Sequence, residues 1–189
     1  MGFSIDQMVA DCLAAVQDPG GQPGAAVEEV LGRAVGNPTA IEAAIGHPSD
    51  LPVITPWFNT DELTVLHIVW PPEVNLMAHD HLMWAAIALY GGREDNEVFR
   101  PLPDGSLEHR QAKTLNRGDT ILLGDETVHA VSNPSREWTG AIHVYGGDYF
   151  RGGKHMWPHT EQPAVPFDVE VVRQTLSEAA TRANASPGA

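Results

Sequence analysis

Two histidines separated by a single residue are the first feature of this chain that suggests chemistry. His79 and His81 flank Asp80 inside a run of residues with β-strand character. On a strand, residues i and i+2 point to the same face, so the two imidazoles project together while Asp80 points away. Two nitrogen atoms held side by side on one strand supply two-thirds of a facial metal site.

A third ligand has to come from a neighbouring strand, and His129 is the best candidate. It lies in a later β-type run, Val128–Ser132. A lone histidine is more often a hydrogen-bonded packing residue than a ligand, and for His129 alone that alternative stays open. Together, the three histidines in strand-like runs favour a three-histidine metal centre.

His143 and Tyr145 form a second pair with the same spacing. By the same i, i+2 rule, an imidazole and a phenol hydroxyl share one face of a strand. If that face is the inside of the fold, the pair is a candidate acid–base relay beside the metal. The alternative is that both side chains only pack in the core, with their polar atoms hydrogen-bonded.

The segment that carries these residues has the texture of an antiparallel β-domain. Between residues 51 and 150, short β-type runs alternate with turn residues such as Pro71-Pro72 and Gly91-Gly92. The expected strands are 63–70, 76–81, 84–90, 97–100, 107–115, 120–123, 128–132 and 138–145. Such a series of short strands predicts a sandwich or a barrel.

Helices are expected on both sides of this β-segment. Apolar residues from Ile5 to Val16 recur at helical spacing, and further helices are expected near 24–33 and 37–45. Asp168 is a suitable N-cap for a C-terminal helix. The expected organisation is a single domain made of a helical extension (1–50), a barrel (51–157) and a Pro-rich segment with a helix (158–189).

These motifs and their order resemble the cupin superfamily, whose barrels carry His-x-His in a first motif and His-x-x-x-Asn in a second. Here the second motif runs from His129 to Asn133. Within that superfamily the chain resembles the thiol dioxygenases, meaning cysteine dioxygenase and especially the bacterial 3-mercaptopropionate dioxygenase-like group. The likeness covers roughly residues 57–157 and includes Gly92–Asn96 and His143–Asp148. It implies an all-β cupin double-stranded β-helix, a jelly-roll barrel, with N-terminal helices and a C-terminal helix.

The resemblance implies Fe(II) as the metal, held by His79, His81 and His129. A typical cupin adds a Glu four or five residues after His-x-His, but here Ala85 and Ala86 stand at those positions. The expected ligand set is therefore three neutral imidazoles without a carboxylate, which resembles the iron sites of thiol dioxygenases. Zinc also accepts three histidines with an open position, so ligand count alone leaves a hydrolytic site open.

The resemblance also implies a catalytic role for Tyr145 and His143. In the family the matching residues belong to a Ser-x-His-x-Tyr relay, with the Tyr hydroxyl near the oxygen and substrate positions. The Ser position is Ala141 in this chain, so the hydrogen bond that would orient His143 is lost or is taken by another group.

Two further departures concern the substrate. No Lys or Arg occurs between Arg33 and Arg93, so the upstream Arg of mammalian-type cysteine dioxygenases is missing. The Arg of the bacterial group is replaced by Lys154, with Arg151 nearby, and a Lys lacks the planar fork of an Arg. We expect Lys154 or Arg151 to bind a substrate carboxylate, with solvated loop cations as the alternative, and Trp84 to be an apolar neighbour of the substrate.

Composition limits the possible partners. The chain has 189 residues, with 11 Lys+Arg against 25 Asp+Glu, and the formal net charge of −14 argues against binding nucleic acid. The single cysteine, Cys12, excludes an internal disulfide and a cysteine-rich metal site. The N-terminus lacks the features of a secretory signal, and no apolar run approaches the roughly 20 residues of a membrane span. A cytoplasmic protein with no membrane partner is expected.

The sequence therefore predicts an iron-dependent dioxygenase that uses O2 to oxidise a small thiol, similar to 3-mercaptopropionate or cysteine, to its sulfinate. Two alternatives remain open because of Ala141 and Lys154. One is a three-histidine metal cupin that acts on a small molecule without a thiol. The other is a cupin that binds a ligand without turnover.

Overall fold

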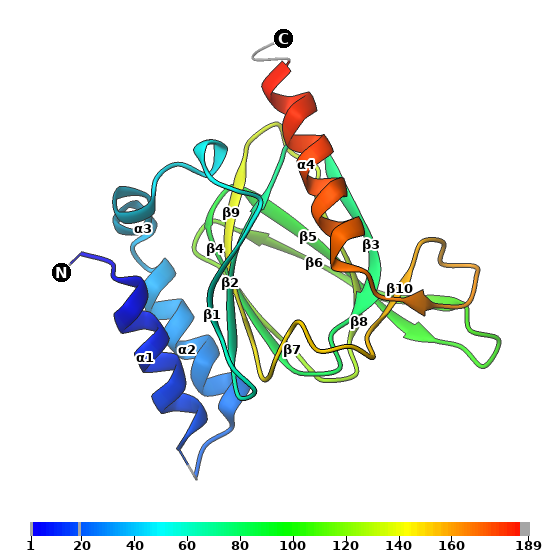
Figure 1. The fold of residues 1–189 in the computed structure, drawn as a ribbon, viewed down its shortest axis with the longest axis horizontal. Helices are drawn as coiled ribbons and strands as arrows, with labels where there is room; N and C mark the ends of the chain where they lie inside the picture. The colour runs from blue at the N-terminus through cyan, green and yellow to red at the C-terminus, as the bar shows by residue number, and fades with distance from the viewer. Residues whose placement is uncertain (1, 19, 186–189) are drawn as a thin grey trace.

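The computed structural model describes residues 2–18 and 20–185 of the chain. Its centre consists of two antiparallel β-sheets that enclose a common interior, with helices packed on the outside (Figure 1). Residues 186–189 of the expected C-terminal segment lie outside the described residues.

The helices and strands follow the order expected from the sequence. The helices are α1 (Ile5–Val16), α2 (Pro23–Val35), α3 (Pro38–Ile45) and α4 (Val169–Ala185), with a 3-10 turn at Pro48–Asp50. The strands are β1 (Ile54–Asn59), β2 (Thr64–Trp70), β3 (Val74–Asp80), β4 (Ala85–Gly91), β5 (Arg93–Pro101), β6 (Leu107–Asn116), β7 (Thr120–Leu123), β8 (Val128–Asn133), β9 (Thr139–Tyr145), β10 (His155–Trp157) and β11 (Val165–Pro166). One sheet has the order β1-β2-β9-β4-β7, and the other has the order β11-β10-β3-β8-β5-β6.

The strand pairing is nested. β5 pairs with β6, β4 with β7, β3 with β8 and β2 with β9, all antiparallel. A long hairpin of this kind, wound so that its pairs alternate between two sheets, is a jelly roll. The expected cupin double-stranded β-helix, with N-terminal helices and a C-terminal helix, is therefore confirmed.

The eight expected strands are all present as β2 to β9. The sequence pattern did not predict β1, β10 and β11, and it predicted too short a range for β5. β5 was expected at 97–100 and begins at Arg93, because its polar first half pairs with β6 and β8 without any apolar alternation to reveal it. β1 contains Pro56 and a register shift, which obscure its pattern. β10 and β11 are too short to show periodicity.

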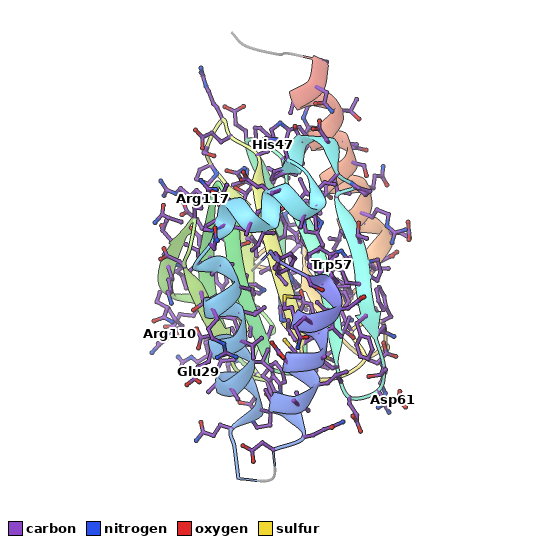
Figure 2. All side chains as sticks on the ribbon, turned by 90° about the vertical axis from the view of Figure 1, so that its left-hand side faces the viewer. Glu29, His47, Trp57, Asp61, Arg110 and Arg117 are labelled. Carbon is purple, nitrogen blue, oxygen red and sulfur yellow. The ribbon has the colours of Figure 1, made fainter. Side chains whose placement is uncertain are left out.

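The first sheet is covered on both faces, which explains why β2, β4 and β9 contain only buried residues. Helices α1, α2 and α3 lie across its outer face, the face toward the viewer in Figure 2. On β4, Ala86, Ala88 and Tyr90 pack against this helical layer, while the residues between them face the barrel interior. Residues on β2 and β9 divide between the two faces in the same way.

Helix α4 packs over the barrel interior, on the side away from α1 to α3 (Figure 1). Asp168 caps its first turn, since its carboxylate accepts a hydrogen bond of 2.8 Å from the backbone N–H of Glu170. The buried face of the helix carries Val172, Leu176 and Ala179, which join the core cluster of the barrel. Among the described helices, none combines the length and the apolar character needed to cross a bilayer.

His67 is a buried histidine of the outer face of the first sheet. Its ring stacks on Trp57 with centroids 5.1 Å apart, and its Nε2 lies 2.7 Å from the hydroxyl of Tyr90. Burial, with a smaller contribution from the neighbouring His143, lowers the pKa of His67 to about 4. The sequence favoured a packing role for this residue over a place near the cavity, and its position in the helix-covered layer agrees with that role.

We predict that His67→Gln weakens the dependence of folding stability on acid. Between pH 6.5 and 4 the unfolded chain binds a proton at His67 that the folded chain rejects, so the free energy of unfolding falls as the pH falls. Removing this group should recover up to about 3 kcal/mol of that loss at pH 4. Urea unfolding of parent and variant from pH 7.5 to 4, with His109→Gln as an exposed control, measures it. Parallel curves for parent and His67→Gln would contradict the assignment.

Candidate metal centre

His79, His81 and His129 lie together inside the barrel. One ring nitrogen from each forms a group whose atoms all lie within 4.8 Å of one another, and all three side chains are buried. Strand pairing explains this arrangement, because His79 on β3 stands directly opposite His129 on β8, and His81 follows the end of β3. The structure thus brings together the three histidines that the sequence singled out.

A β-bulge in β3 turns the histidines inward. Leu76 pairs with Val131 and His79 pairs with His129, so Met77 and Ala78 stand opposite a single residue of β8. Leu76 faces the interior, and strict alternation from it would bring Ala78 inward next. The bulge reverses the alternation, so Ala78 packs in a different cluster and His79 turns inward.

Asp80 faces away from the three rings, as the i, i+2 rule predicts. Its carboxylate accepts hydrogen bonds from the backbone N–H of His155, at 2.8 Å, and from the ring Nδ1 of the same residue, at 2.9 Å. His155 lies on β10, so this contact fastens the strand that follows the barrel to the strand that carries His79. Asp80 therefore has a structural role on the outside of the barrel.

Hydrogen bonds to their other nitrogens orient two of the rings. His129 Nδ1 lies 2.8 Å from Asn96 Oδ1, and Asn96 Nδ2 donates to Glu94 Oε1, also at 2.8 Å. An amide oxygen only accepts, so His129 carries its proton on Nδ1 and keeps a lone pair on Nε2. His79 Nδ1 lies 3.0 Å from the carbonyl oxygen of Met77, which gives His79 the same tautomer. Such contacts are the usual support of histidine ligands.

The free nitrogens face one another in a way that suits a cation. His81 Nε2 and His129 Nε2 are 3.4 Å apart. Because His129 Nε2 carries a lone pair, this contact needs a proton or a metal ion between the two atoms. Burial lowers the pKa of all three histidines, to about 4 for His79 and well below 6.5 for the other two. Neutral, buried imidazoles are the form that binds a transition metal, so the residues fit one.

Tyr145 and His143 line the same interior from β9. The ring centroids of Tyr145 and His81 are 5.0 Å apart, and the Tyr145 hydroxyl lies 3.2 Å from His143 Nδ1. Burial, with smaller contributions from Tyr149 and Glu94, raises the pKa of Tyr145 well above 10, so its hydroxyl keeps its proton at neutral pH. A phenol and an imidazole therefore stand beside the three-histidine group.

The cavity that these side chains enclose is small. Its volume is about 20 Å³, enough for one water molecule. The three histidines, His143 and Tyr145 form its polar wall, and the rest is apolar or aromatic: Ile54, Leu66, Ile68, Trp70, Leu76, Val131, Tyr149, Val172 and Leu176. Val172 and Leu176 come from α4, so this helix closes one side of the cavity.

Lys154 and Arg151 line a second, outer hollow, which lies next to the inner cavity. It has a volume of about 90 Å³ and shares Tyr149 with the inner cavity. Lys154 is buried, donates to the carbonyl oxygen of Tyr149, and holds its Nζ 3.9 Å from the centre of the Tyr149 ring and 5.0 Å from that of Phe167. Burial lowers the pKa of Lys154 to about 8. Arg151 is exposed, so the two cations expected at the substrate end differ in their surroundings.

Trp84 is not brought to the cavity. Its ring lies in the layer between the first sheet and the helices, so close to Gly146 and Gly24 that a Cβ at either position would crowd the indole. It lines neither the inner cavity nor the outer hollow. The proposed substrate contact of Trp84 thus has no support in the structure. The cause is strand parity, since Trp84 and Ala85 point to opposite faces of the sheet.

Two residues of the site were not identified from the sequence. Glu94 and Asn96 lie on β5, are fully buried, and connect to His129 from the side opposite the cavity. Their i, i+2 spacing was the available signal, but polar residues in a charged segment resemble a solvated turn. Asn133 of the second motif has another role, since its side chain binds the backbone oxygens of Trp70 and Glu137 and so fixes the turn after β8.

Comparison with known proteins gives likenesses of fold. No protein-family model matches the chain, and no curated protein matches it. A double-stranded β-helix protein from Klebsiella pneumoniae is 15% identical, with a TM-score of 0.46 over 57% of this chain and 85% of the other. An RmlC-like cupin family protein from Methanocaldococcus jannaschii is 13% identical, with a TM-score of 0.44 over 52% and 83%. Oxalate decarboxylase from Bacillus subtilis is 13% identical, with a TM-score of 0.40 over 48% and 22%. Similarity at this level does not indicate what the chain does.

We predict that the protein binds about one equivalent of a transition metal, as three-histidine sites do. His79→Ala and His129→Ala should each remove most of it, because two imidazoles hold a metal ion far less tightly than three. Elemental analysis after reconstitution and desalting measures the content. His159→Ala, which removes an exposed histidine, is the control and should retain the metal. Equal metal content in all four proteins would show that the ligands are elsewhere.

Proposed function

We propose that the protein holds Fe(II) through His79, His81 and His129 and oxidises a small thiol to its sulfinate with O2. The observation that carries the proposal is the pairing of a three-imidazole group, without a carboxylate among its ligand atoms, with the Tyr145 hydroxyl on the same cavity wall. In the reaction RSH + O2 → RSO2⁻ + H⁺, both oxygen atoms go to sulfur, which loses the four electrons that O2 gains.

Bound Fe(II) would lower the pKa of the thiol and provide a path for electrons from sulfur to O2. Three neutral ligands leave the positive charge of the ion uncompensated, which favours an anionic substrate such as a thiolate. The residues of the chain support this chemistry by shielding a small, partly apolar cavity from bulk water.

Tyr145 supplies the hydroxyl nearest to this chemistry. Its raised pKa keeps the proton on oxygen, and His143 Nδ1 holds the hydroxyl in place. A positioned hydroxyl in a cavity shielded from bulk water stabilises charge that develops on a neighbouring oxygen or sulfur atom. In this proposal Tyr145 is the catalytic residue, and His143 determines the direction of its hydrogen bond.

Lys154 is the group proposed to bind the end of the substrate remote from sulfur. It is the buried cation beside the inner cavity, and with a pKa of about 8 it is mostly charged at pH 7. Among the described residues that line the cavity and the outer hollow, no Asp or Glu is present to accept the ammonium group of cysteine. We therefore propose a thiol carboxylate without an amine, such as 3-mercaptopropionate, as a better substrate than L-cysteine.

Oxygen consumption by the iron-loaded protein tests the proposed function directly. The panel should include 3-mercaptopropionate, L-cysteine, an uncharged thiol and small carboxylates without a thiol, with the sulfinate product identified by mass spectrometry. Turnover of a compound without a thiol would support the alternative of a metal cupin with another substrate. Binding of a thiol without oxygen uptake would support a ligand-binding cupin. Either result would overturn the thiol dioxygenase proposal.

We predict that Tyr145→Phe lowers kcat by about 10- to 100-fold while iron content stays the same, because it deletes one hydroxyl and keeps the ring. Steady-state rates and iron content of the two proteins measure this. Tyr90→Phe is a matched control, since Tyr90 is an equally buried tyrosine on the helix-covered face. If Tyr145→Phe turns over as fast as the parent protein, Tyr145 is only a packing residue.

We predict that Lys154→Met raises KM for 3-mercaptopropionate by about 10- to 100-fold, the contribution of one charge-assisted hydrogen bond. Met is a similarly long, uncharged side chain, so the substitution removes the positive charge that lies over the rings of Tyr149 and Phe167. The KM for an uncharged thiol should not change, because no carboxylate is present to lose its partner. Arg151→Met is the control at an exposed cation of the same loop. If KM for 3-mercaptopropionate rises only in Arg151→Met, the substrate carboxylate binds Arg151 and not Lys154.

A further inference from the structure

Glu94 is a buried carboxylate at the centre of the site, yet it touches neither cavity. Its exposed fraction is 0%, and it lies on β5 behind the wall formed by the histidines. Burying a carboxylate is costly unless hydrogen bonds satisfy its oxygens. The contacts of its two oxygen atoms therefore indicate what this residue does.

The two oxygens of Glu94 face different neighbours. Oε1 accepts the hydrogen bond from Asn96 Nδ2, and Asn96 in turn accepts from His129. Oε2 lies 3.7 Å from Nε2 of His143. Within the described residues, just three buried side-chain nitrogen or oxygen atoms lack a hydrogen-bond partner, and two of them are this oxygen and this nitrogen.

A carboxylate oxygen without a donor and an imidazole nitrogen without a partner satisfy each other when the nitrogen carries a proton. The distance of 3.7 Å is longer than a normal N–H···O hydrogen bond, so a hydrogen bond between the two atoms requires a side-chain movement of a few tenths of an ångström or more. His143 would then carry its proton on Nε2. Its Nδ1, which lies 3.2 Å from the Tyr145 hydroxyl, would have a lone pair that accepts the hydroxyl proton.

We propose that Glu94 is a positioning residue that acts on both halves of the site. Through Asn96 it orients His129, and through its other oxygen it keeps the proton of His143 on Nε2. Tyr145 thereby gains a fixed acceptor, in a chain of contacts that runs Glu94–His143–Tyr145. The role of this chain in turnover rests on the proposed function, whereas the tautomer of His143 does not.

The position of Ala141 is consistent with this assignment. Ala141 lies two residues before His143 on β9, faces the interior, and offers no hydroxyl to orient the ring. Among the described residues, the Tyr145 hydroxyl and the Glu94 carboxylate are the polar groups that lie next to the ring nitrogens of His143. Glu94 thus supplies the orienting contact that Ala141 cannot make.

The first test reads the tautomer in the metal-free protein. Long-range ¹H–¹⁵N NMR spectra distinguish imidazoles protonated on Nδ1 from those protonated on Nε2, and a His143→Gln variant identifies the signals of His143. We expect the Nε2–H form for His143 and the Nδ1–H form for His129. An Nδ1–H form of His143 in the parent protein would overturn the proposal, whatever the catalytic activity.

Glu94→Gln provides a sharper test because only one orientation of the new amide suits Asn96. Its oxygen must accept from Asn96 Nδ2, so its NH2 group faces His143 and donates to Nε2. The His143 proton should therefore move to Nδ1, which reverses the hydrogen bond to Tyr145. Glu97→Gln is the matched control, since it makes the same change at an exposed position of β5 and should leave the tautomer unchanged.

Metal affinity separates the two halves of the proposal. Glu94→Gln keeps the contact with Asn96, so its Co(II) affinity, measured by optical titration, should stay close to that of the parent. Glu94→Ala removes this contact and should weaken Co(II) binding by about 10- to 100-fold. Thermal melts identify a variant that does not fold. If neither variant folds, the tautomer of His143 in the parent protein still tests the proposal. Unchanged affinity in folded Glu94→Ala would refute the action on His129.

Kinetics tests the proposal once a substrate is known. Because Glu94 lines neither the inner cavity nor the outer hollow, Glu94→Gln should lower kcat about tenfold or more and leave KM nearly unchanged. A change in KM alone would contradict a positioning role. Absence of thiol turnover in the parent protein would refute the proposed function and leave the tautomer result intact.

Discussion

The antiparallel pairing of β3 with β8 is the interaction on which the candidate site depends. It sets His79 opposite His129, and the bulge at Met77 turns His81 toward the same interior. Without the bulge, the inward position would pass to Asp80, and the ligand set would contain a carboxylate in place of neutral imidazoles. The ligand set influences which metal and which substrate charge a site favours, so one extra residue in a strand determines the class of chemistry available here.

The surrounding fold offsets the free-energy cost of burying this site. The site combines groups that are costly to bury, a carboxylate, a lysine and four imidazoles, within one barrel. The first sheet offsets part of that cost, because strands buried on both faces remove much apolar surface from water. Hydrogen bonds offset another part, since the side-chain oxygen of Asn96 and the carbonyl oxygen of Met77 each accept a hydrogen bond from a histidine ring. The outer face of the sheet thus supports polar chemistry on the inner face.

The strands and the His79–His81 pair could be predicted from short-range patterns, whereas the jelly-roll barrel and the place of His129 in the ligand set rested on the resemblance to the cupins as well. Residues two apart on a strand share a face, and β-type runs between turns show strands. The polar first half of β5 could not be recognised as a strand in this way, so Glu94 and Asn96 were not assigned to the site. Periodicity also gives no sign of which face of a doubly covered sheet is the interior, and the substrate contact proposed for Trp84 therefore has no support in the structure. The bulge of β3 depends on pairing with β8, which no local pattern records.

The nested strand pairing has a consequence for the order in which the protein folds. β5 and β6 are neighbours in the chain and need only a short turn to meet, whereas residues 81–127 separate β3 from β8. Closing a long loop costs more conformational entropy than closing a short one, so we expect pairing to spread outward from the β5–β6 hairpin. The three histidines would then meet only after the inner strand pairs have formed. A metal ion in the cell would encounter a nearly complete barrel rather than direct its assembly.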